Sequence, residues 1–366
     1  MHLLEILNQC KRTFVLQNFI DMDAKKEIRD LTLDDIKNEL QTIGEKAFRA
    51  QQIWDWLWVK QVRSIDDMSN LSKELRQHLK NEFAFRTITI DKIQVSEDGT
   101  QKFRFKTFDG HSIEGVLIPT TNRLTACISS QVGCSLTCKF CATGKLGRIR
   151  NLYFDEIFDQ VAIINQKAME VYDKKLTNIV YMGMGEPLLN YKSVMKSIDF
   201  ITSPKAMAMS PSRITVSTAG IAKQIRQLAD DNAKFNLALS LHAADDAKRS
   251  KMMTINDSNN LKELVEALDY YFKKTKIAVT YEYILFEGIN DTLEDVMNIA
   301  KMCKRIPSKV NVIEYNTVDG TGFRKPDEES FDKFIEQLQK NRVNVRVRKS
   351  RGKDIDAACG QLANKG

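Results

Sequence analysis

Three cysteines stand close together in the segment Cys134-Ser-Leu-Thr-Cys138-Lys-Phe-Cys141. If the chain's seven cysteines were placed at random, this spacing would arise with a probability of about 0.003, so a shared ligand is the better explanation. A structural zinc ion would need a fourth protein ligand, yet no second cysteine pair follows and His242 is the only later histidine. Three thiolates on a [4Fe–4S] cluster would leave one iron open, and an open iron can bind a substrate that carries an amine and a carboxylate.

Other polar residues stand where predicted strands end. The segment Met182-Gly-Met-Gly-Glu186-Pro follows the second predicted strand of the central region and places Gly185 beside Glu186. A Gly-x-Gly pair alone is commonly a turn, and this one lacks the third glycine and the opening helix of a dinucleotide-binding motif. Taken singly, the residues at the next strand ends are typical of ordinary capping, but together they indicate one shared site. They are Ser217, the run Ser240-Leu241-His242, and Asn316.

These residues need a scaffold, and the pattern after Pro119 predicts one. Short β-branched runs alternate with amphipathic helical runs, which is typical of parallel strands joined by crossover helices. Six such repeats are too few for a closed eight-stranded barrel, so we expect an α/β fold with an open, partial (βα)6 barrel and its chemistry at the carboxyl ends of the strands. The predicted strands are Leu124–Ser129, Asn178–Met182, Arg213–Ser217, Phe235–Leu241, Ile277–Leu285 and Val310–Glu314. The predicted helices lie near 155–172, 191–201, 219–229, 261–273 and 292–304, followed by a helix near 327–340 and a strand at Val343–Arg348.

The region before Pro119 has a different texture. Up to about Phe85 the pattern is helical, and the segment Ala47–Val59 contains all three tryptophans, at positions 54, 56 and 58. Such a stripe is more typical of helix packing than of a binding surface. It could also face RNA together with the nearby basic residues Lys46, Arg49, Lys60 and Arg63. From Thr87 to Ile118 apolar alternation, with turns at Asp98-Gly99 and Asp109-Gly110, predicts a small antiparallel extension.

Composition limits the class of protein. The chain has 366 residues, of which 43% are hydrophobic and 28% charged, as expected for a packed globular protein. No run approaches the roughly 18 apolar residues of a membrane span, and Met1–Ile20 mixes polar residues among its apolar ones, so we expect a soluble protein without a secretory signal. The net charge of +7 indicates a mild preference for polyanions. A basic patch near the end could bind phosphate or could simply be a solvated face: Arg342, Arg346, Arg348, Lys349, Arg351 and Lys353.

The cysteine motif, its place after the first strand of the repeated region and the aromatic Phe140 before Cys141 resemble the radical S-adenosylmethionine (SAM) enzymes. In that family a [4Fe–4S] cluster, here on Cys134, Cys138 and Cys141, cleaves SAM to a 5′-deoxyadenosyl radical. The resemblance implies that Gly185 and Glu186 hold the methionine end of SAM. It also implies a SAM-binding role for the strand-end residues Ser217, Ser240, Leu241, His242 and Asn316.

Further motifs resemble the RlmN-type adenine C2 methyltransferases, from about residue 40 to 363. They include Cys127-Ile-Ser-Ser-Gln-Val-Gly-Cys134, Arg150-Asn-Leu, Ser240-Leu-His and the tail Arg351-Gly-Lys-Asp-Ile-Asp-Ala-Ala-Cys359-Gly-Gln-Leu. The related Cfr-type enzymes methylate C8 instead, but Val132 before Gly133 and Pro187 after Glu186 resemble RlmN more. One departure is Asn316-Thr317, where the family often has Asn-Pro.

Carbon C2 of adenine lies between two electron-withdrawing nitrogens, so it cannot simply displace a methyl group from SAM. The resemblance implies that Cys359 first accepts the methyl group, that a radical from a second SAM activates it, and that Cys127 releases the product by forming a disulfide with Cys359. Glu114 would accept the C2 proton. Arg351 and Lys353 near Cys359 could favour its reactive thiolate. Without the resemblance, the two cysteines would be interpreted as buried packing residues and Glu114 as a surface carboxylate; Cys10 and Cys303 match no role.

The resemblance implies two substrates, nucleotide 2503 of 23S rRNA and adenosine 37 of tRNA. It also implies an electron donor such as flavodoxin or ferredoxin, a cytoplasmic location and no membrane; we further expect a monomer. We expect residues 1–86 to form a helical RNA-binding domain, 87–119 a β extension or linker, 120–349 the radical SAM core and 350–366 a catalytic tail. Two alternatives stay open: C8 methylation of the Cfr type, or a non-catalytic RNA-binding protein with a structural metal.

Overall fold

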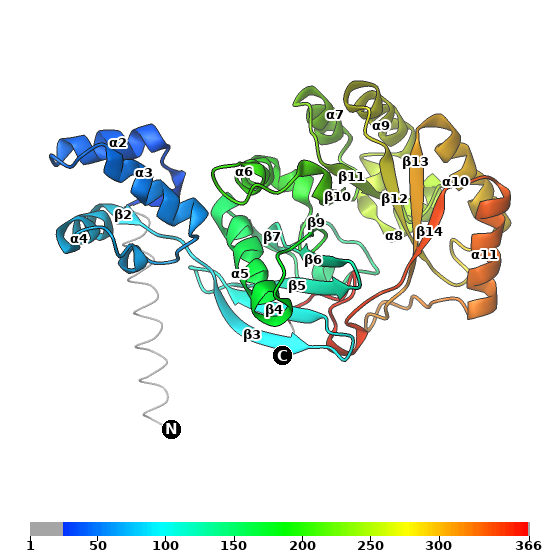
Figure 1. The fold of residues 1–366 in the computed structure, drawn as a ribbon. Helices are drawn as coiled ribbons and strands as arrows, with labels where there is room; N and C mark the ends of the chain where they lie inside the picture. Colours follow the sequence, from blue (N-terminus) through cyan, green and yellow to red (C-terminus); the bar gives the residue numbers. More distant parts are fainter. Residues whose placement is uncertain (1–24, 365–366) are drawn as a thin grey trace.

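The strands of the alternating region and those of the antiparallel extension form one ten-stranded sheet. Figure 1 shows its arrangement. A computed structural model describes residues 25–364, so Cys10 and the segment Met1–Ile20 lie outside the described residues. The sheet order is β14-β13-β12-β11-β10-β9-β6-β5-β4-β3. The two edge strands β14 and β3 do not pair with each other, so the barrel is open, as predicted. Its parallel part comprises β6 (Arg123–Cys127), β9 (Asn178–Tyr181), β10 (Ile214–Thr218), β11 (Asn236–Ser240), β12 (Val279–Leu285), β13 (Ser308–Glu314) and β14 (Val345–Arg348).

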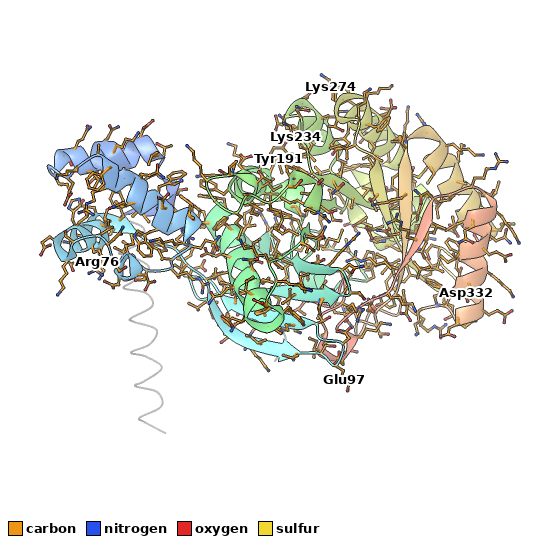
Figure 2. The ribbon with its side chains drawn as sticks, viewed as in Figure 1. Arg76, Glu97, Tyr191, Lys234, Lys274 and Asp332 are labelled. Atoms are coloured by element: carbon orange, nitrogen blue, oxygen red, sulfur yellow. The ribbon has the colours of Figure 1, made fainter. Side chains whose placement is uncertain are left out.

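A crossover helix follows each parallel strand except β14, which confirms the predicted βα repeats. Amphipathic helices allow this arrangement because each buries one apolar face against the sheet and leaves the other to solvent. Figure 2 shows the solvent side, where Lys274 on α9 and Asp332 on α11 point away from the molecule. The helices are α5 (Phe154–Tyr172), α6 (Tyr191–Thr202), α7 (Ala222–Asp230), α9 (Leu261–Thr275), α10 (Leu293–Arg305) and α11 (Glu328–Lys340).

Three short elements of the region after Pro119 were not predicted from the sequence. Helix α8 (Asp246–Met252) lies between β11 and α9, and the strands β7 (Gln131–Gly133) and β8 (Arg148–Asn151) form a hairpin around the cysteine motif. Each is shorter than the window over which a helical or strand period can be recognised.

The predicted antiparallel extension adds three strands to the edge of the parallel sheet. They are β3 (Thr89–Val95), β4 (Gln101–Lys106) and β5 (Ser112–Thr120), and β5 pairs with β6 so that Val116 lies opposite Cys127. The turn between β3 and β4 contains Gly99 at φ 83°, a backbone conformation that favours glycine. The extension is therefore continuous with the sheet that carries the cysteine motif.

The N-terminal helices gather at one side of the core (Figure 1). They are α2 (Leu33–Thr42), α3 (Phe48–Trp54), which continues as one π-helical turn at Asp55–Val59, and α4 (Lys73–Glu82); the short strands β1 (Lys26–Glu27) and β2 (Phe83–Ala84) pair beside them. The domain boundaries at 86, 119 and 349 stay a prediction.

Of the tryptophans at positions 54, 56 and 58, one is fully buried and the others are partly exposed. Trp58 is fully buried, and its ring centroid lies 4.0 Å from that of Phe200 on α6 and 5.3 Å from that of Phe158 on α5. Trp56 is only partly buried, and the Lys60 ammonium lies 3.3 Å from its ring centroid. The interpretation as packing is thus confirmed for Trp58, which joins the N-terminal helices to the core.

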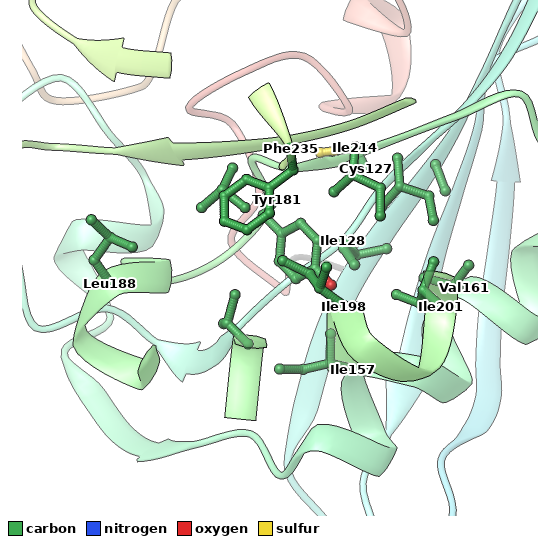
Figure 3. Close-up of a cluster of buried hydrophobic side chains, with 14 of the residues drawn as sticks. Cys127, Ile128, Ile157, Val161, Tyr181, Leu188, Ile198, Ile201, Ile214 and Phe235 are labelled. Carbon is green, nitrogen blue, oxygen red and sulfur yellow. The ribbon is translucent and has the colours of Figure 1, made fainter. Parts of the chain in front are cut away.

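Within the core, the sheet packs against α5 and α6 through a cluster of buried apolar side chains (Figure 3). Tyr181 of β9 is in this cluster and its hydroxyl forms a hydrogen bond of 2.8 Å with Ser197 of α6. Cys127, at the end of β6, belongs to the same cluster. None of the helices in residues 25–364 has the length and apolar character needed to cross a membrane.

Candidate active site

A cavity of about 940 Å³ opens at the carboxyl ends of the parallel strands. Its wall contains all three cysteines of the motif and most of the predicted strand-end residues. The predicted residues that line it are Cys134, Cys138, Cys141, Gly185, Glu186, Ser217, Ser240, His242 and Cys359. The structure thus brings together side chains that are as far apart in the chain as residues 134 and 359.

The loop that carries the cysteines is fixed at several points. The Leu136 amide donates to the sulfur of Cys134 at 3.4 Å, and the Cys141 amide donates to the carbonyl of Cys138 at 3.1 Å. The Lys139 amide donates to the carbonyl of Met252, at the end of α8. Burial raises the pKa of Cys134 to about 11, so its thiolate needs a positive partner such as a metal.

The geometry of these thiols bears on the kind of metal they could hold. Among residues 25–364, no three His, Cys, Asp or Glu side chains converge on a point where one metal ion could bind. The three thiols nevertheless face one cavity. In a [4Fe–4S] cluster each thiolate binds a different iron, whereas a closed zinc site needs four ligands around one ion. The arrangement therefore fits the cluster and does not fit a structural zinc.

The Gly-x-Gly segment passes very close to the loop after β6. A Cβ atom at Gly183 would lie 2.7 Å from the carbonyl oxygen of Ile128, and one at Gly185 would lie 2.5 Å from the Cβ of Gln131. Gly185 also has φ 98°. Only glycine meets both requirements, so these residues place Glu186 at the cavity wall.

Glu186 is buried and held by backbone donors. Its Oε2 accepts from the Ala219 amide at 2.7 Å and its Oε1 from the Leu188 amide at 3.0 Å. Burial raises the pKa of Glu186 to about 7. A carboxylate in this position suits the ammonium group of an amino-acid ligand.

The ends of β10 and β11 add further polar groups. Ser217 and Ser240 lie side by side, with hydroxyl oxygens 3.4 Å apart. Burial lowers the pKa of His242 to about 3, so the ring is neutral, and its Nδ1 accepts from the Ile284 amide at 3.1 Å. Its proton is therefore on Nε2 and is available to a ligand.

Two predicted SAM-binding residues do not line the cavity. Leu241 is fully buried, and its carbonyl accepts from the Arg249 guanidinium at 3.1 Å. Asn316 lies after β13, where its side-chain nitrogen donates to the Ser350 hydroxyl at 2.8 Å while its buried Oδ1 has no protein partner. Their predicted roles remain predictions.

Arg249 of α8 is a positioning residue that the sequence did not reveal. Its buried guanidinium donates to the carbonyls of Ala219, Ser240 and Leu241, and so ties the ends of β10 and β11 together. Nothing in Lys248-Arg249-Ser250-Lys251 separates it from its basic neighbours before the fold is known.

A second cavity of about 530 Å³ adjoins the first. Cys127 and Cys359 both line it, and Cys359 lines the larger cavity as well. Both thiols are free. Burial raises the pKa of Cys127 to about 12, and a charge on Cys359 adds to this effect.

The tail that carries Cys359 is fastened on both sides. The Gly360 carbonyl accepts from the Ala142 amide at 2.8 Å, next to the last cysteine of the motif. Oε2 of Glu114 accepts from the amides of Ala363 and Asn364 at 2.9 and 3.1 Å. Glu114 is a buried residue of β5 and lines neither cavity. Its carboxylate contacts the tail rather than either cavity wall.

The expectation that Arg351 and Lys353 serve Cys359 is not supported by their contacts. Lys353 forms an ion pair with Glu314; Arg351 lines the second cavity with Cys359, but its guanidinium lies 3.8 Å from Asp98. Arg348 is the basic residue that lines both cavities beside Cys359. Closeness in the chain to Cys359 therefore did not predict which basic residue lines both cavities with it.

An open parallel barrel whose cavity joins a three-cysteine loop to a glycine–glutamate element defines the class of radical SAM enzymes. Residues 128–303 match the family model described as radical SAM superfamily, and residues 26–84 match the ribosomal RNA large subunit methyltransferase N-terminal domain. A radical SAM methyltransferase from Sphaerobacter thermophilus has 37% sequence identity and a TM-score of 0.88, over 93% of this chain and 100% of that one.

Sequence relatives identify the family. The probable dual-specificity RNA methyltransferase RlmN of Christiangramia forsetii is 51% identical over 94% of this chain and 97% of its own length. The corresponding protein of Cytophaga hutchinsonii is 53% identical over 93% of each chain, and the dual-specificity RNA methyltransferase RlmN of Bdellovibrio bacteriovorus is 42% identical over 91% of this chain and 82% of its own. The chain belongs to the RlmN family of radical SAM methyltransferases and is a SAM-dependent enzyme.

Proposed function

We propose that this chain methylates C2 of adenine at nucleotide 2503 of 23S rRNA and at adenosine 37 of tRNA. One observation carries the proposal: Cys359 lines both the cavity with the three cysteines and the cavity with Cys127. A sulfur in that position can accept a methyl group from a molecule bound in the first cavity. It can also form a covalent bond with Cys127 in the second. The relatives' names supply the substrate class, which is RNA.

The cavity wall suits a [4Fe–4S] cluster on Cys134, Cys138 and Cys141, which when bound supplies reductive cleavage of SAM to a 5′-deoxyadenosyl radical. Gly185, Glu186 and the strand-end residues Ser217, Ser240, Leu241, His242 and Asn316 are proposed to hold SAM. Neutral His242 can donate from Nε2, and the carboxylate of Glu186 can accept from an ammonium group.

Cys359 is proposed as the methyl carrier. Its thiolate attacks the methyl carbon of one SAM, which leaves S-adenosylhomocysteine and an S-methyl group on the protein. The 5′-deoxyadenosyl radical would take a hydrogen atom from that group, and the resulting carbon radical would add to C2 of adenine. Loss of one electron to the cluster and of the C2 proton would then leave the RNA bound through Cys359. The small neighbours Ala357, Ala358 and Gly360 leave room beside the sulfur.

Cys127 is proposed to resolve this adduct. Its thiolate attacks the sulfur of Cys359 and a disulfide forms. The electron pair of the broken carbon–sulfur bond passes to the adenine-bound carbon, which takes up a proton and becomes the methyl group. Glu114 is proposed to accept the C2 proton, which requires its hydrogen bonds with Ala363 and Asn364 to open first.

The RNA must present an unstacked adenine, at a cost of about a few kcal/mol, so an RNA loop is the expected substrate. We propose that the N-terminal helices contribute to RNA binding, with the partly exposed Trp56 and Lys60 among the contacts. A flavodoxin or ferredoxin is proposed as the electron donor, and the enzyme is proposed to act as a monomer in the cytoplasm.

The proposal is tested by mass spectrometry of nucleosides from rRNA and tRNA after anaerobic incubation with reconstituted protein, reductant and methyl-labelled SAM. Labelled 2-methyladenosine in both RNAs is expected. Labelled 8-methyladenosine would show Cfr-type chemistry instead, and no labelled adenosine, with an intact cluster, would overturn the proposed substrate. In a matched pair of variants, Cys127→Ala should accumulate a covalent protein–RNA adduct, whereas Cys303→Ala should release product as the unmodified protein does.

A further inference from the structure

Five residues line both cavities and so form the wall between them: Met182, Ile313, Arg348, Cys359 and Leu362. Three of these are apolar, one is the cysteine proposed as the methyl carrier, and Arg348 is the one charged residue. A thiolate is costly in such an apolar wall unless a cation lies beside it.

Arg348 is the last residue of β14, opposite Ile313 of β13. Its Nη1 lies 3.3 Å from the sulfur of Met182 and 3.5 Å from Oε2 of Glu282. A thioether is a weak acceptor, and the distance to the carboxylate is long for a charge-assisted hydrogen bond. Because a guanidinium has five N–H donors, Arg348 keeps capacity for a further anion.

The other charged groups near Cys359 are committed elsewhere or have the wrong sign. Lys349 and Arg351 line the second cavity but not the first. The Arg351 guanidinium lies 3.8 Å from Asp98, the side chain of Lys349 is exposed, and Lys353 pairs with Glu314. Glu282 binds Asn311 through its other oxygen at 2.8 Å. The remaining titratable groups that line the two cavities are the acid Glu186, the neutral His242, Cys127, the three thiols of the motif and Tyr181, whose hydroxyl is hydrogen-bonded with Ser197.

We propose that Arg348 is a positioning residue that supplies the counter-charge for the Cys359 thiolate and so keeps this sulfur ready to accept a methyl group. This inference rests on the proposed role of Cys359. A negative charge on Cys359 is the largest cause of the raised pKa of the Arg348 guanidinium, which agrees with the geometry.

The charges balance through the step. The sulfur lone pair of the thiolate forms a bond to the methyl carbon, and the electron pair of the broken carbon–sulfonium bond stays on S-adenosylhomocysteine. Cys359 then carries a neutral thioether, so Arg348 loses its anion and is left with Glu282 as its counter-charge. A lysine could supply the same charge with fewer donors.

The test measures the reactivity of Cys359 in reduced protein without cluster, SAM or RNA. Iodoacetamide labelling is followed by mass spectrometry from pH 6 to 10, because the tryptic peptide of residues 354–365 contains Cys359 and no other cysteine. In Arg348→Met the labelling of Cys359 at pH 7 should slow roughly tenfold, because the thiolate loses the cation beside it. Arg348→Lys should restore most of the reactivity.

Lys353→Met is the matched control, because Lys353 is closer in the chain to Cys359 yet faces Glu314. It should leave the labelling profile unchanged, and Cys303 in each variant reports whether the fold is kept. The proposal is overturned if Arg348→Met labels as the unmodified protein does, if Lys353→Met shifts the profile equally, or if Arg348→Lys is no better than Arg348→Met. A shift at Cys359 in an enzyme that makes no methyladenosine would instead refute the proposed function alone.

Discussion

At the scale of single residues, Glu186 offers a test of how SAM is held. Burial raises its pKa to about 7, so its carboxylate becomes protonated as the pH falls through neutrality and can no longer attract an ammonium group. We therefore expect SAM to bind more weakly at pH 6 than at pH 8. Glu186→Gln keeps the acceptor for the Ala219 amide but should weaken binding about tenfold or more at pH 8 and remove most of the pH dependence. Calorimetric titration with SAM under anaerobic conditions measures both, and equal affinities for the two proteins would exclude this role.

Residue types and spacing predicted the residues that share a motif, but not those that act through distant partners. Cys134, Cys138 and Cys141 are close in the chain, so their spacing carries the signal. Arg249 binds backbone carbonyls, and carbonyls are present at every position, so no side-chain pattern marks it. Arg348 looked like one cation of a basic patch because its orientation depends on the register of β14.

At the scale of elements, the β extension holds the tail that carries Cys359. Asp98, in the turn between β3 and β4, accepts from the Gly352 amide at 3.0 Å, and Asp354 accepts from the Ser96 hydroxyl at 2.6 Å. Burial alone would raise the pKa of Asp98, but hydrogen bonds from Thr100, Gly352 and Ser96 lower it to about 2, so it is ionised throughout the physiological range.

Asp98→Ala should therefore loosen the tail without disturbing the cysteine loop. Loss of a hydrogen bond to a charged group corresponds to about 1.5–3 kcal/mol, so amide exchange in residues 350–364 should accelerate roughly tenfold to a hundredfold. Hydrogen exchange followed by mass spectrometry measures this change. Asp91→Ala is the control, since Asp91 on β3 pairs with Arg104. Equal exchange of the tail in both variants would contradict the role of Asp98 in holding the tail.

The sequence predicted the strands and crossover helices within about two residues in most cases, because each carries its own period. Contact between the extension and the tail was not predicted, since Ser96 and Asp354 are 258 positions apart and both are ordinary turn residues. The hydrogen bonds of Glu114 with the tail amides were not predicted for the same reason, and its role as proton acceptor stays a prediction.

At the scale of the whole molecule, a buried charge cluster joins the N-terminal region to the core. Arg29 lies 2.6 Å from Asp159 of α5, and Glu27 accepts from the Arg86 amide at 2.6 Å. The carboxylates of Glu27, Asp155 and Asp159 outnumber the two guanidinium groups. Burial and the charge of Asp155 raise the pKa of Glu27 to about 7, although Arg29 and Arg86 act in the opposite direction.

This shift predicts that the junction weakens as the pH rises. Glu27 has a higher pKa in the folded chain than its ordinary value of 4.5, so its contribution to stability is complete below about 4.5 and is lost as the pH rises through about 7. Urea unfolding followed by tryptophan fluorescence suits the test, because all three tryptophans lie between positions 54 and 58. Between pH 5 and 7.5 the free energy of unfolding should fall less in Glu27→Gln than in the unmodified protein, by on the order of 2 kcal/mol. Asp34→Asn, which alters an exposed pair with Lys37, should leave the slope unchanged. If Glu27→Gln keeps the full pH dependence, another group must govern the junction.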